Sequence, residues 1–427
     1  ASFADRFHDL LMEIPYFREH PEHIRLVASH GEPLTHNVVA LVRGTGKRTI
    51  AMAGHFDTVS TDNYHELQNL ACDTPALHQA LIETISARTS RSEQEERALA
   101  DLLSGDFLPG RGLLDMKSGL AVAVACLEQF AADPDRQGNL VLVATPDEER
   151  ESRGMRSLRD ALPSIVKDLD IDIAAGINLD VTSDQGDGSE GRAVYAGTIG
   201  KLLPFALVVG CSSHASYPFE GVSAQAMGAA ILSRLEGKAA LADRDNNDIS
   251  PPPICLEAKD LRDGYEVTTP ERFWVAFNWL YHTMSADELF LRFKEQVTAG
   301  AEEAVDTFAE QALQFGTLAG KSAGAIPAKP RILSFDELKT IAGQVAGEDF
   351  PSIYAEEERS LSGIDNPLVV TRRLTAWLVV IARVSGPAVI IGFAGLHYPP
   401  SHLNHDVEND RALHEAIEQA RSRLASD

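Results

Sequence analysis

Histidine and acidic side chains that could bind a metal gather in four short stretches of the sequence. These residues are His55, Asp57, Asp115, Glu148, Glu149 and Asp180. An imidazole together with carboxylate oxygens suits zinc, cobalt or manganese. A carboxylate that bridges two ions would complete a site whose metals lie about 3.5–4 Å apart. The four stretches together therefore predict a centre that holds two divalent metal ions.

Three of these stretches follow a segment with the pattern of a β-strand. The segments are residues 48–54, 139–144 and 171–179. The last two are short apolar runs, the pattern expected of strands that are buried on both faces. Open α/β sheets place their sites at the carboxyl ends of the strands. We therefore expect the acidic and histidine side chains to meet at one edge of a sheet.

Each stretch also has an ordinary structural explanation. His55 and Asp57 would fit a polar turn, and Asp115 would fit the N-cap of a helix predicted for residues 117–130. The acidic run 147–149 would fit a solvated loop, although consecutive carboxylates repel one another unless a cation or solvent lies among them. Four such stretches in one chain favour the metal centre over four separate coincidences.

The wider pattern of elements predicts an α/β fold with a mostly parallel sheet, because strand-like and helix-like segments alternate. Residues 37–43 and 48–54 have the pattern of two strands joined in a hairpin. Near the end of the chain, residues 388–393 predict a further strand of the same kind, followed by a helix at residues 410–424.

The middle of the chain follows a different pattern, β-α-β-β-α-β, which is typical of a ferredoxin-like domain. Its helices are predicted at residues 224–235 and 286–297. We therefore expect a catalytic domain made of residues 1–197 and 316–427, interrupted by a ferredoxin-like insert at residues 198–315.

Composition limits the partners that this chain could have. The 38 basic and 63 acidic residues give a net charge of −25, which argues against nucleic acid or an anionic membrane surface as a partner. The apolar segment 374–393 is interrupted by Arg383 and Pro387, so we do not expect it to span a membrane. Residues 1–25 lack the apolar core of a signal peptide, so we expect none there. Four cysteines without C-x-x-C spacing favour the reducing cytoplasm.

The stretches together resemble a family of di-zinc enzymes: aminoacylases, acetylornithine deacetylases, succinyl-diaminopimelate desuccinylases and glutamate carboxypeptidases. The family pattern H-x-D-x-V is similar to residues 55–59, G-R-G-x-x-D-x-K-x-G to residues 110–119, and E-E-x-x-S-x-G to residues 148–154. In the insert, residues 214–221 match H-x-x-x-P-x-x-G. The resemblance implies hydrolysis of an amide bond in a small substrate derived from an amino acid.

The same resemblance implies a set of metal ligands. His55 and Asp180 would bind one ion, Glu149 the other, and Asp115 would bridge both. A last ligand would be a histidine after a late strand, for which the sequence offers His397, His402 and His405. We prefer His402, because it lies beyond a proline turn and shortly before the final helix.

The resemblance also implies roles for three residues that do not bind metal. Asp57 would orient His55, and Glu148 would be the general base that deprotonates the metal-bound water. His214 would come from the insert, which would act as a lid and form a homodimer, and would stabilise the oxyanion in the other subunit's site. The alternative is a non-catalytic protein of the same fold that binds a ligand in amino-acid catabolism, but such a binder would not need Glu148.

Three features distinguish this chain from the general family pattern. Ser223 stands where an asparagine is usual, and the strand predicted at residues 275–280 lacks the arginine with which many relatives bind a substrate carboxylate. The segment between Val59 and Gly110 is longer than in typical relatives. In this respect the chain resembles the arginine-utilisation branch of the family.

Overall fold

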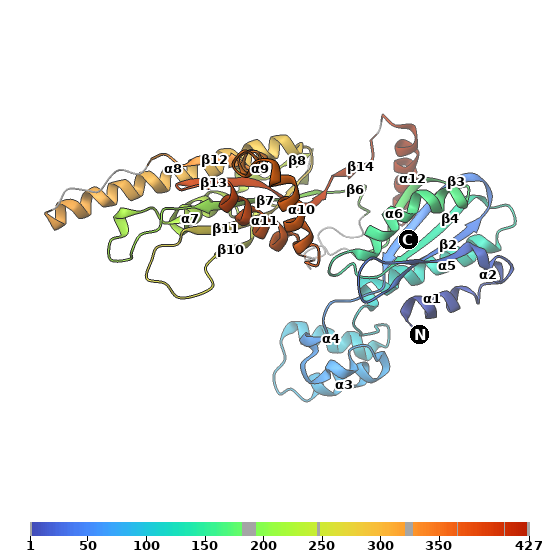
Figure 1. Ribbon diagram of the computed structural model, residues 1–427. Helices are drawn as coiled ribbons and strands as arrows, with labels where there is room; N and C mark the ends of the chain where they lie inside the picture. Colours follow the sequence, from blue (N-terminus) through green and yellow to red (C-terminus); the bar gives the residue numbers. More distant parts are fainter. Residues whose placement is uncertain are drawn as a thin grey trace. The chain divides into compact units, whose positions relative to one another are not determined.

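The structure is a computed structural model that describes residues 2–181, 194–245, 248–320, 328–364, 366–404 and 406–424. The chain forms two compact units (Figure 1). The first unit comprises Ala1–Ala193 and Glu415–Asp427, and the second comprises Val194–His414. Each unit contains a five-stranded sheet with helices packed on its faces, so the α/β class expected from the sequence is confirmed.

The first unit has a mixed sheet with the strand order β1-β2-β4-β3-β5. Its strands are β1 (Ile24–Ala28), β2 (His36–Arg43), β3 (Thr45–His55), β4 (Gln137–Thr145) and β5 (Asp172–Asn178). Strands β4, β3 and β5 run parallel to one another, whereas β2 runs antiparallel to both of its neighbours, β1 and β4. The carboxyl ends of β3, β4 and β5 therefore lie at one edge of the sheet.

Two expectations about this sheet were wrong. Strands β2 and β3 do not form a hairpin, because β4 lies between them and pairs with both. The backbone at Gly44 lies against β4: a Cβ there would come within 2.3 Å of the Gly138 carbonyl oxygen. Strand β5 is half-exposed rather than buried on both faces, since it is the last strand of the sheet.

Helices cover both faces of the first sheet. Helices α1 (Phe3–Leu11), α2 (Pro15–Glu19) and α5 (Ser118–Ala132) pack on one face, and α6 (Arg153–Asp168) packs on the other. Side chains of β2 pack alternately in the cores on the two faces, with Val38 and Ala40 on one side and Val39 and Leu41 on the other. This double burial explains the apolar runs in β2 and β4.

The long segment between Val59 and Gly110 folds into a small helical substructure. It contains the turns at Asp62–Leu70 followed by α3 (Thr74–Ser86) and α4 (Glu93–Ser104). The two helices pack on a core of their own, formed by Ile85, Leu99 and Leu102. Figure 1 shows α3 and α4 lying side by side. Much of this segment is thus a pair of helices with a core of its own.

The second unit has the ferredoxin-like topology that its sequence pattern predicts. Its sheet has the order β10-β11-β7-β13-β12, and the strands are β7 (Gly200–Val209), β10 (Ile254–Asp260), β11 (Arg272–Tyr281), β12 (Arg331–Ser334) and β13 (Ala388–Tyr398). Helices α7 (Ala224–Leu235) and α8 (Ala286–Ala319) cover one face. Helices α9 (Phe335–Ala346), α10 (Phe350–Leu361) and α11 (Pro367–Ile381) cover the other.

The late strand lies in a different sheet from the one we expected. Strand β13 pairs antiparallel with β7 along most of its length and is the fourth strand of the ferredoxin-like pattern. Residues 316–414 therefore group with the second unit, and the expected assignment of residues 316–427 to the first domain was wrong over most of that range. The physical reason is the apolar register of β13, whose alternate side chains enter the cores on both faces of the β7 sheet.

Helix α8 is much longer than the helix predicted for residues 286–297. It runs for 34 residues, begins at a capping box between Ser285 and Glu288, and ends at Gly320. None of the described helices, including α8, is both long enough and apolar enough to cross a membrane. The final helix is α12 (Glu408–Leu424).

Candidate metal centre

Three carboxylates of the first unit converge on one edge of the His55 ring. The Nε2 atom of His55 lies 3.0 Å from an oxygen of Asp115, 3.8 Å from an oxygen of Asp180 and 3.9 Å from an oxygen of Glu148. Ligand atoms from His55, Asp115 and Asp180 all lie within 4.8 Å of one another. The side chains that the sequence places after separate strands are therefore brought together.

The position of His55 is fixed by the sheet. It is the last residue of β3 and pairs with Thr145, the last residue of β4. Its backbone N–H donates to the Met116 sulfur at 3.1 Å, and the residue is only 2% exposed. The buried imidazole presents Nε2 to the carboxylates.

Asp57 lies at the other edge of the same ring. One of its oxygens is 3.4 Å from Nδ1 of His55. Its carboxylate also accepts hydrogen bonds from the backbone N–H groups of Glu148 at 3.0 Å and Glu149 at 3.1 Å. Asp57 therefore holds the loop after β4 and lies beside Nδ1 of His55, a buried atom without a hydrogen-bond partner in the described part of the chain.

Asp115 does not cap the helix that follows it. Helix α5 has Lys117 at its N-cap position and makes no side-chain cap hydrogen bond, while Asp115 has extended backbone angles. Gly119 lets the first turn of α5 approach the end of β5, because a Cβ there would lie 2.4 Å from the Leu179 carbonyl oxygen. This close approach brings Asp115 and Asp180 to the same place, and the N-cap alternative is contradicted.

The three acidic residues after β4 have different environments. Asp147 forms an ion pair with Arg153 at 2.9 Å, and hydrogen bonds from Arg153 hold the pKa of that carboxyl below its usual range. Burial raises the pKa of Glu148, and the negative charges of Asp180, Glu149 and Asp57 raise it further, against the opposing effect of His55. Glu148 therefore holds its proton more tightly than an ordinary glutamate, whereas Asp147 is a structural anchor.

Glu149 differs from the other metal ligands predicted in this unit. Its backbone is tied to Asp57, but within the described part of the chain its side chain is not one of the three groups that cluster at His55. Its assignment to a second metal stays a prediction.

The donor set fits a divalent cation. His55 is buried and faces several carboxylates, and carboxylates held this close repel one another unless a positive charge lies among them. An imidazole nitrogen with aspartate oxygens, and a second carboxylate on the remaining ring nitrogen, is a set that zinc and related ions bind.

Two neighbouring residues have roles that the sequence did not suggest. Met116 accepts the His55 N–H, and Lys117 lies half-buried with its amino group close to Asp57 and Asp115. Burial lowers the pKa of Lys117, which the charges of the two aspartates partly oppose. Both residues belong to the motif at residues 110–119, which is the feature of the sequence that could have pointed to them.

The remaining predicted site residues lie in the second unit. His214 is exposed, and its Nδ1 accepts a hydrogen bond from the Ser216 backbone at 3.1 Å. His402 is exposed on the short strand β14 (Ser401–His402), which pairs with β6 (Gly197–Thr198). His397 lies 2.8 Å from the Tyr281 hydroxyl, and His405 lies outside the described residues.

The comparison with protein families agrees with this geometry. Residues 102–420 match the model of the peptidase family M20/M25/M40. The chain belongs to that family. Peptidases are hydrolases, so the family expected from the motifs and its hydrolytic character are both confirmed. His55 and Asp57 precede the matched residues, and their place in the site comes from the structure.

Curated relatives give the same result. The chain is 29% identical to the uncharacterised protein YqjN of Bacillus subtilis over 409 residues, which cover 93% of this chain and 71% of YqjN. It is 28% identical to protein RocB of Bacillus subtilis over 325 residues, covering 74% of this chain and 56% of RocB. It is 30% identical over 186 residues to a succinyl-diaminopimelate desuccinylase of Bordetella avium, covering 43% of this chain and 46% of the relative. The chain thus spans about half the length of the last two relatives.

Proposed function

We propose that this protein is a metal-dependent hydrolase that cleaves an amide bond in a small substrate derived from an amino acid. The observation that carries the proposal is the convergence of Asp115, Asp180 and Glu148 on Nε2 of the buried His55. Such a group at the carboxyl ends of parallel strands has the chemistry of a catalytic metal centre.

Two divalent ions, zinc or alternatively cobalt or manganese, would be held by the carboxylates around His55. His55 and Asp180 would bind one ion, Glu149 the other, and Asp115 would bridge them. When bound, such ions polarise a carbonyl group and lower the pKa of water.

Glu148 would be the general base of the reaction. Its carboxylate lies beside the cluster but is not needed as a ligand, and burial raises its pKa, which favours a group that takes and returns a proton. It would accept the proton of the attacking water on a carboxylate oxygen and then pass it to the leaving amine. Asp57 would keep the His55 ring in place throughout.

His402 would supply the last ligand. The ring of His397 is held by the Tyr281 hydroxyl, whereas among the described residues no side-chain hydrogen bond or ion pair involves His402. This difference supports His402 over His397.

The second unit would act as a lid and join two chains into a homodimer in which each His214 serves the partner's site. Support comes from the edge strand β10, which leaves Ile254 and Leu256 exposed at 42% and 51%. Mixing Glu148→Gln chains with His214→Ala chains tests this arrangement, because one site of each mixed dimer would then be intact. Mixed chains that exchange subunits and remain inactive would contradict it.

We place the protein in the cytoplasm, where its four cysteines, which are all free thiols, would remain reduced.

The activity is tested by turnover of a panel of N-acyl amino acids and dipeptides, measured together with metal content. Wild-type protein should release free amine with at least one substrate, and Asp115→Ala should lose both metal and turnover. Protein that binds metal fully and cleaves no member of the panel would favour a ligand-binding role for the same site.

A further inference from the structure

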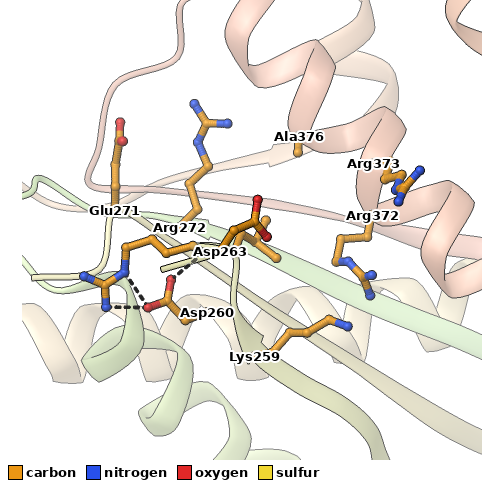
Figure 2. Close-up of a pocket in the computed structure, with 10 residues that line it drawn as sticks. Lys259, Asp260, Asp263, Glu271, Arg272, Arg372, Arg373 and Ala376 are labelled. Atoms are coloured by element: carbon orange, nitrogen blue, oxygen red, sulfur yellow. Dashed lines mark hydrogen bonds and ion pairs between the residues drawn. The ribbon is translucent and has the colours of Figure 1, made fainter. Parts of the chain in front are cut away.

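The second unit contains a cavity with a strongly basic lining. It has a volume of about 730 Å³ and lies between the β10–β11 connection and helix α11. The basic residues that line it are Lys259, Arg262, Arg272, Arg372 and Arg373. Figure 2 shows Arg372 and Arg373 on the helix, with Lys259 and Arg272 on the neighbouring strands. A concentration of cations is notable in a chain whose net charge is −25.

Some of these cations already have carboxylate partners. Lys259 and Arg372 both pair with Glu257, so that one carboxylate serves two positive charges. Arg262 pairs with Asp260 and also donates to the Thr268 carbonyl oxygen at 2.9 Å. The Arg262 pair is neutral, whereas the Glu257 group keeps one excess positive charge.

Arg272 and Arg373 have no such partner within the described part of the chain. Arg272 is half-buried, and its Nε atom is buried without any hydrogen-bond acceptor. A guanidinium nitrogen in that state is costly, because it has lost water and gained nothing in return.

The backbone that carries Arg272 is held rigidly. The carbonyl of Arg272 accepts a hydrogen bond from Leu261 N–H, and the carbonyl of Glu271 accepts one from Gly210 N–H at 2.7 Å. Side chains alternate along β11, so Arg272 shares the sheet face of Trp274, which packs in the core beneath α11. The side chain is therefore directed to the face where Arg372 and Arg373 lie.

Three carboxylates also line the cavity: Asp260, which pairs with Arg262, and Asp263 and Glu271. Asp263 and Glu271 are exposed, as is Arg373, so water screens the charges of all three side chains. With Glu257 included, five cations face four carboxylates, so one positive charge is in excess, and Arg272 and Arg373 are the cations without a carboxylate partner in the described part of the chain.

We propose that this cavity binds a small organic molecule that carries two or more carboxylate or phosphate groups. Arginine forks bind either oxyanion through paired hydrogen bonds, and several separate cations suit a ligand with several anionic groups. The cavity volume lies within the range of small-molecule sites. None of its lining residues belongs to the metal centre, so this site is distinct from the one proposed for hydrolysis.

Titration calorimetry on the full chain tests the proposal with two probes. Tricarballylate supplies three carboxylates, and fructose 1,6-bisphosphate supplies two phosphates. Saturable binding of either probe is expected, and the tighter of the two identifies the oxyanion that the site prefers. Arg272→Gln and Arg373→Gln should each raise the dissociation constant by about tenfold or more. That is the loss of affinity expected when one charge-assisted hydrogen bond is removed.

Arg292→Gln is the matched control, because Arg292 is an exposed arginine on α8, which covers the opposite face of the sheet. It should leave both dissociation constants unchanged. The exposed Arg373 can be replaced without disturbing the core, so that variant decides the question if Arg272→Gln fails to fold. The proposal is overturned if neither probe binds saturably at millimolar concentration, or if Arg373→Gln binds as tightly as wild type.

Discussion

The Asp57 carboxylate lies 3.4 Å from Nδ1 of His55, at the ring edge opposite to Nε2. Asp57 also receives the backbone N–H groups of Glu148 and Glu149, so a single carboxylate connects the imidazole to the loop that carries the proposed base. The N–H on Nδ1 would point at Asp57, which leaves the lone pair of Nε2 free for a metal.

Asp57→Asn should weaken metal binding, because an amide no longer fixes the tautomer of His55. We expect a loss of about 10–100-fold in affinity, the usual cost of removing the partner of a metal-binding histidine. Competition with a chelating dye measures it. Asp101→Asn, a change at an exposed aspartate on α4, should leave the affinity intact. Equal affinities for the two variants would show that Asp57 does not orient His55.

Glu148→Gln should remove turnover while leaving metal content near that of wild type, since a base is lost and no ligand is. A positioned general base contributes about 10²–10⁴-fold, so kcat should fall by that factor. Steady-state kinetics measures the fall in kcat, and elemental analysis of the same preparation measures the metal content. Loss of metal from Glu148→Gln would mean that Glu148 is a ligand and that its role and that of Glu149 must be exchanged.

His402→Ala should lower metal occupancy, and His397→Ala should not. The second change removes a ring whose Nε2 lies 2.8 Å from the Tyr281 hydroxyl, so its cost should appear in thermal stability. Elemental analysis after dialysis against a weak chelator separates the two outcomes. If His397→Ala is the variant that loses metal, the last ligand is His397.

Asp243 should stabilise the second unit in a pH-dependent way. Its carboxylate accepts backbone N–H groups from His282, Thr283 and Met284 at 2.7–3.1 Å. Burial alone would raise the pKa of Asp243, but these hydrogen bonds outweigh it and hold the pKa below the ordinary value of 3.8. The stabilisation is therefore complete above the unfolded pKa and is lost as the pH falls through the lower folded pKa.

Asp243→Asn should accordingly lower the free energy of unfolding at neutral pH by about 1–3 kcal/mol, the cost of leaving buried N–H groups unsatisfied. Urea denaturation at several pH values measures the difference between the two proteins. That difference should shrink once the pH is below 3.8. A difference that stays constant from neutral to acidic pH would show that charge on Asp243 is not the cause.

Much of the metal centre could be predicted from the sequence, because its residues follow short strands whose ends meet in any parallel sheet. His55 and Asp180 were identified in this way, Asp115 was identified from the motif at residues 110–119, and the three side chains do converge. The role of Met116 could not be predicted, since nothing in the sequence says that a backbone N–H at His55 faces a sulfur.

The topology was harder to predict than the site. The short linker at residues 44–47 suggested a hairpin, yet β4 lies between the two strands that it joins. The strand β13 was placed in the wrong sheet because an apolar strand fits either core, and pairing with a strand almost two hundred residues earlier leaves no local signal. The local pattern of apolar and polar residues predicted the individual helices and strands. Which strands share a sheet depends on pairing between distant segments, and the local pattern does not contain that information.

The central claim is that ions bind where His55, Asp115 and Asp180 converge. Anomalous diffraction from crystals of metal-loaded protein, collected on both sides of the zinc absorption edge, tests it most directly. The account predicts a peak about 2.0–2.2 Å from Nε2 of His55 and from oxygens of Asp115 and Asp180, with a second peak about 3.5–4 Å away. Fully loaded crystals in which no peak lies within bonding distance of His55 would contradict it.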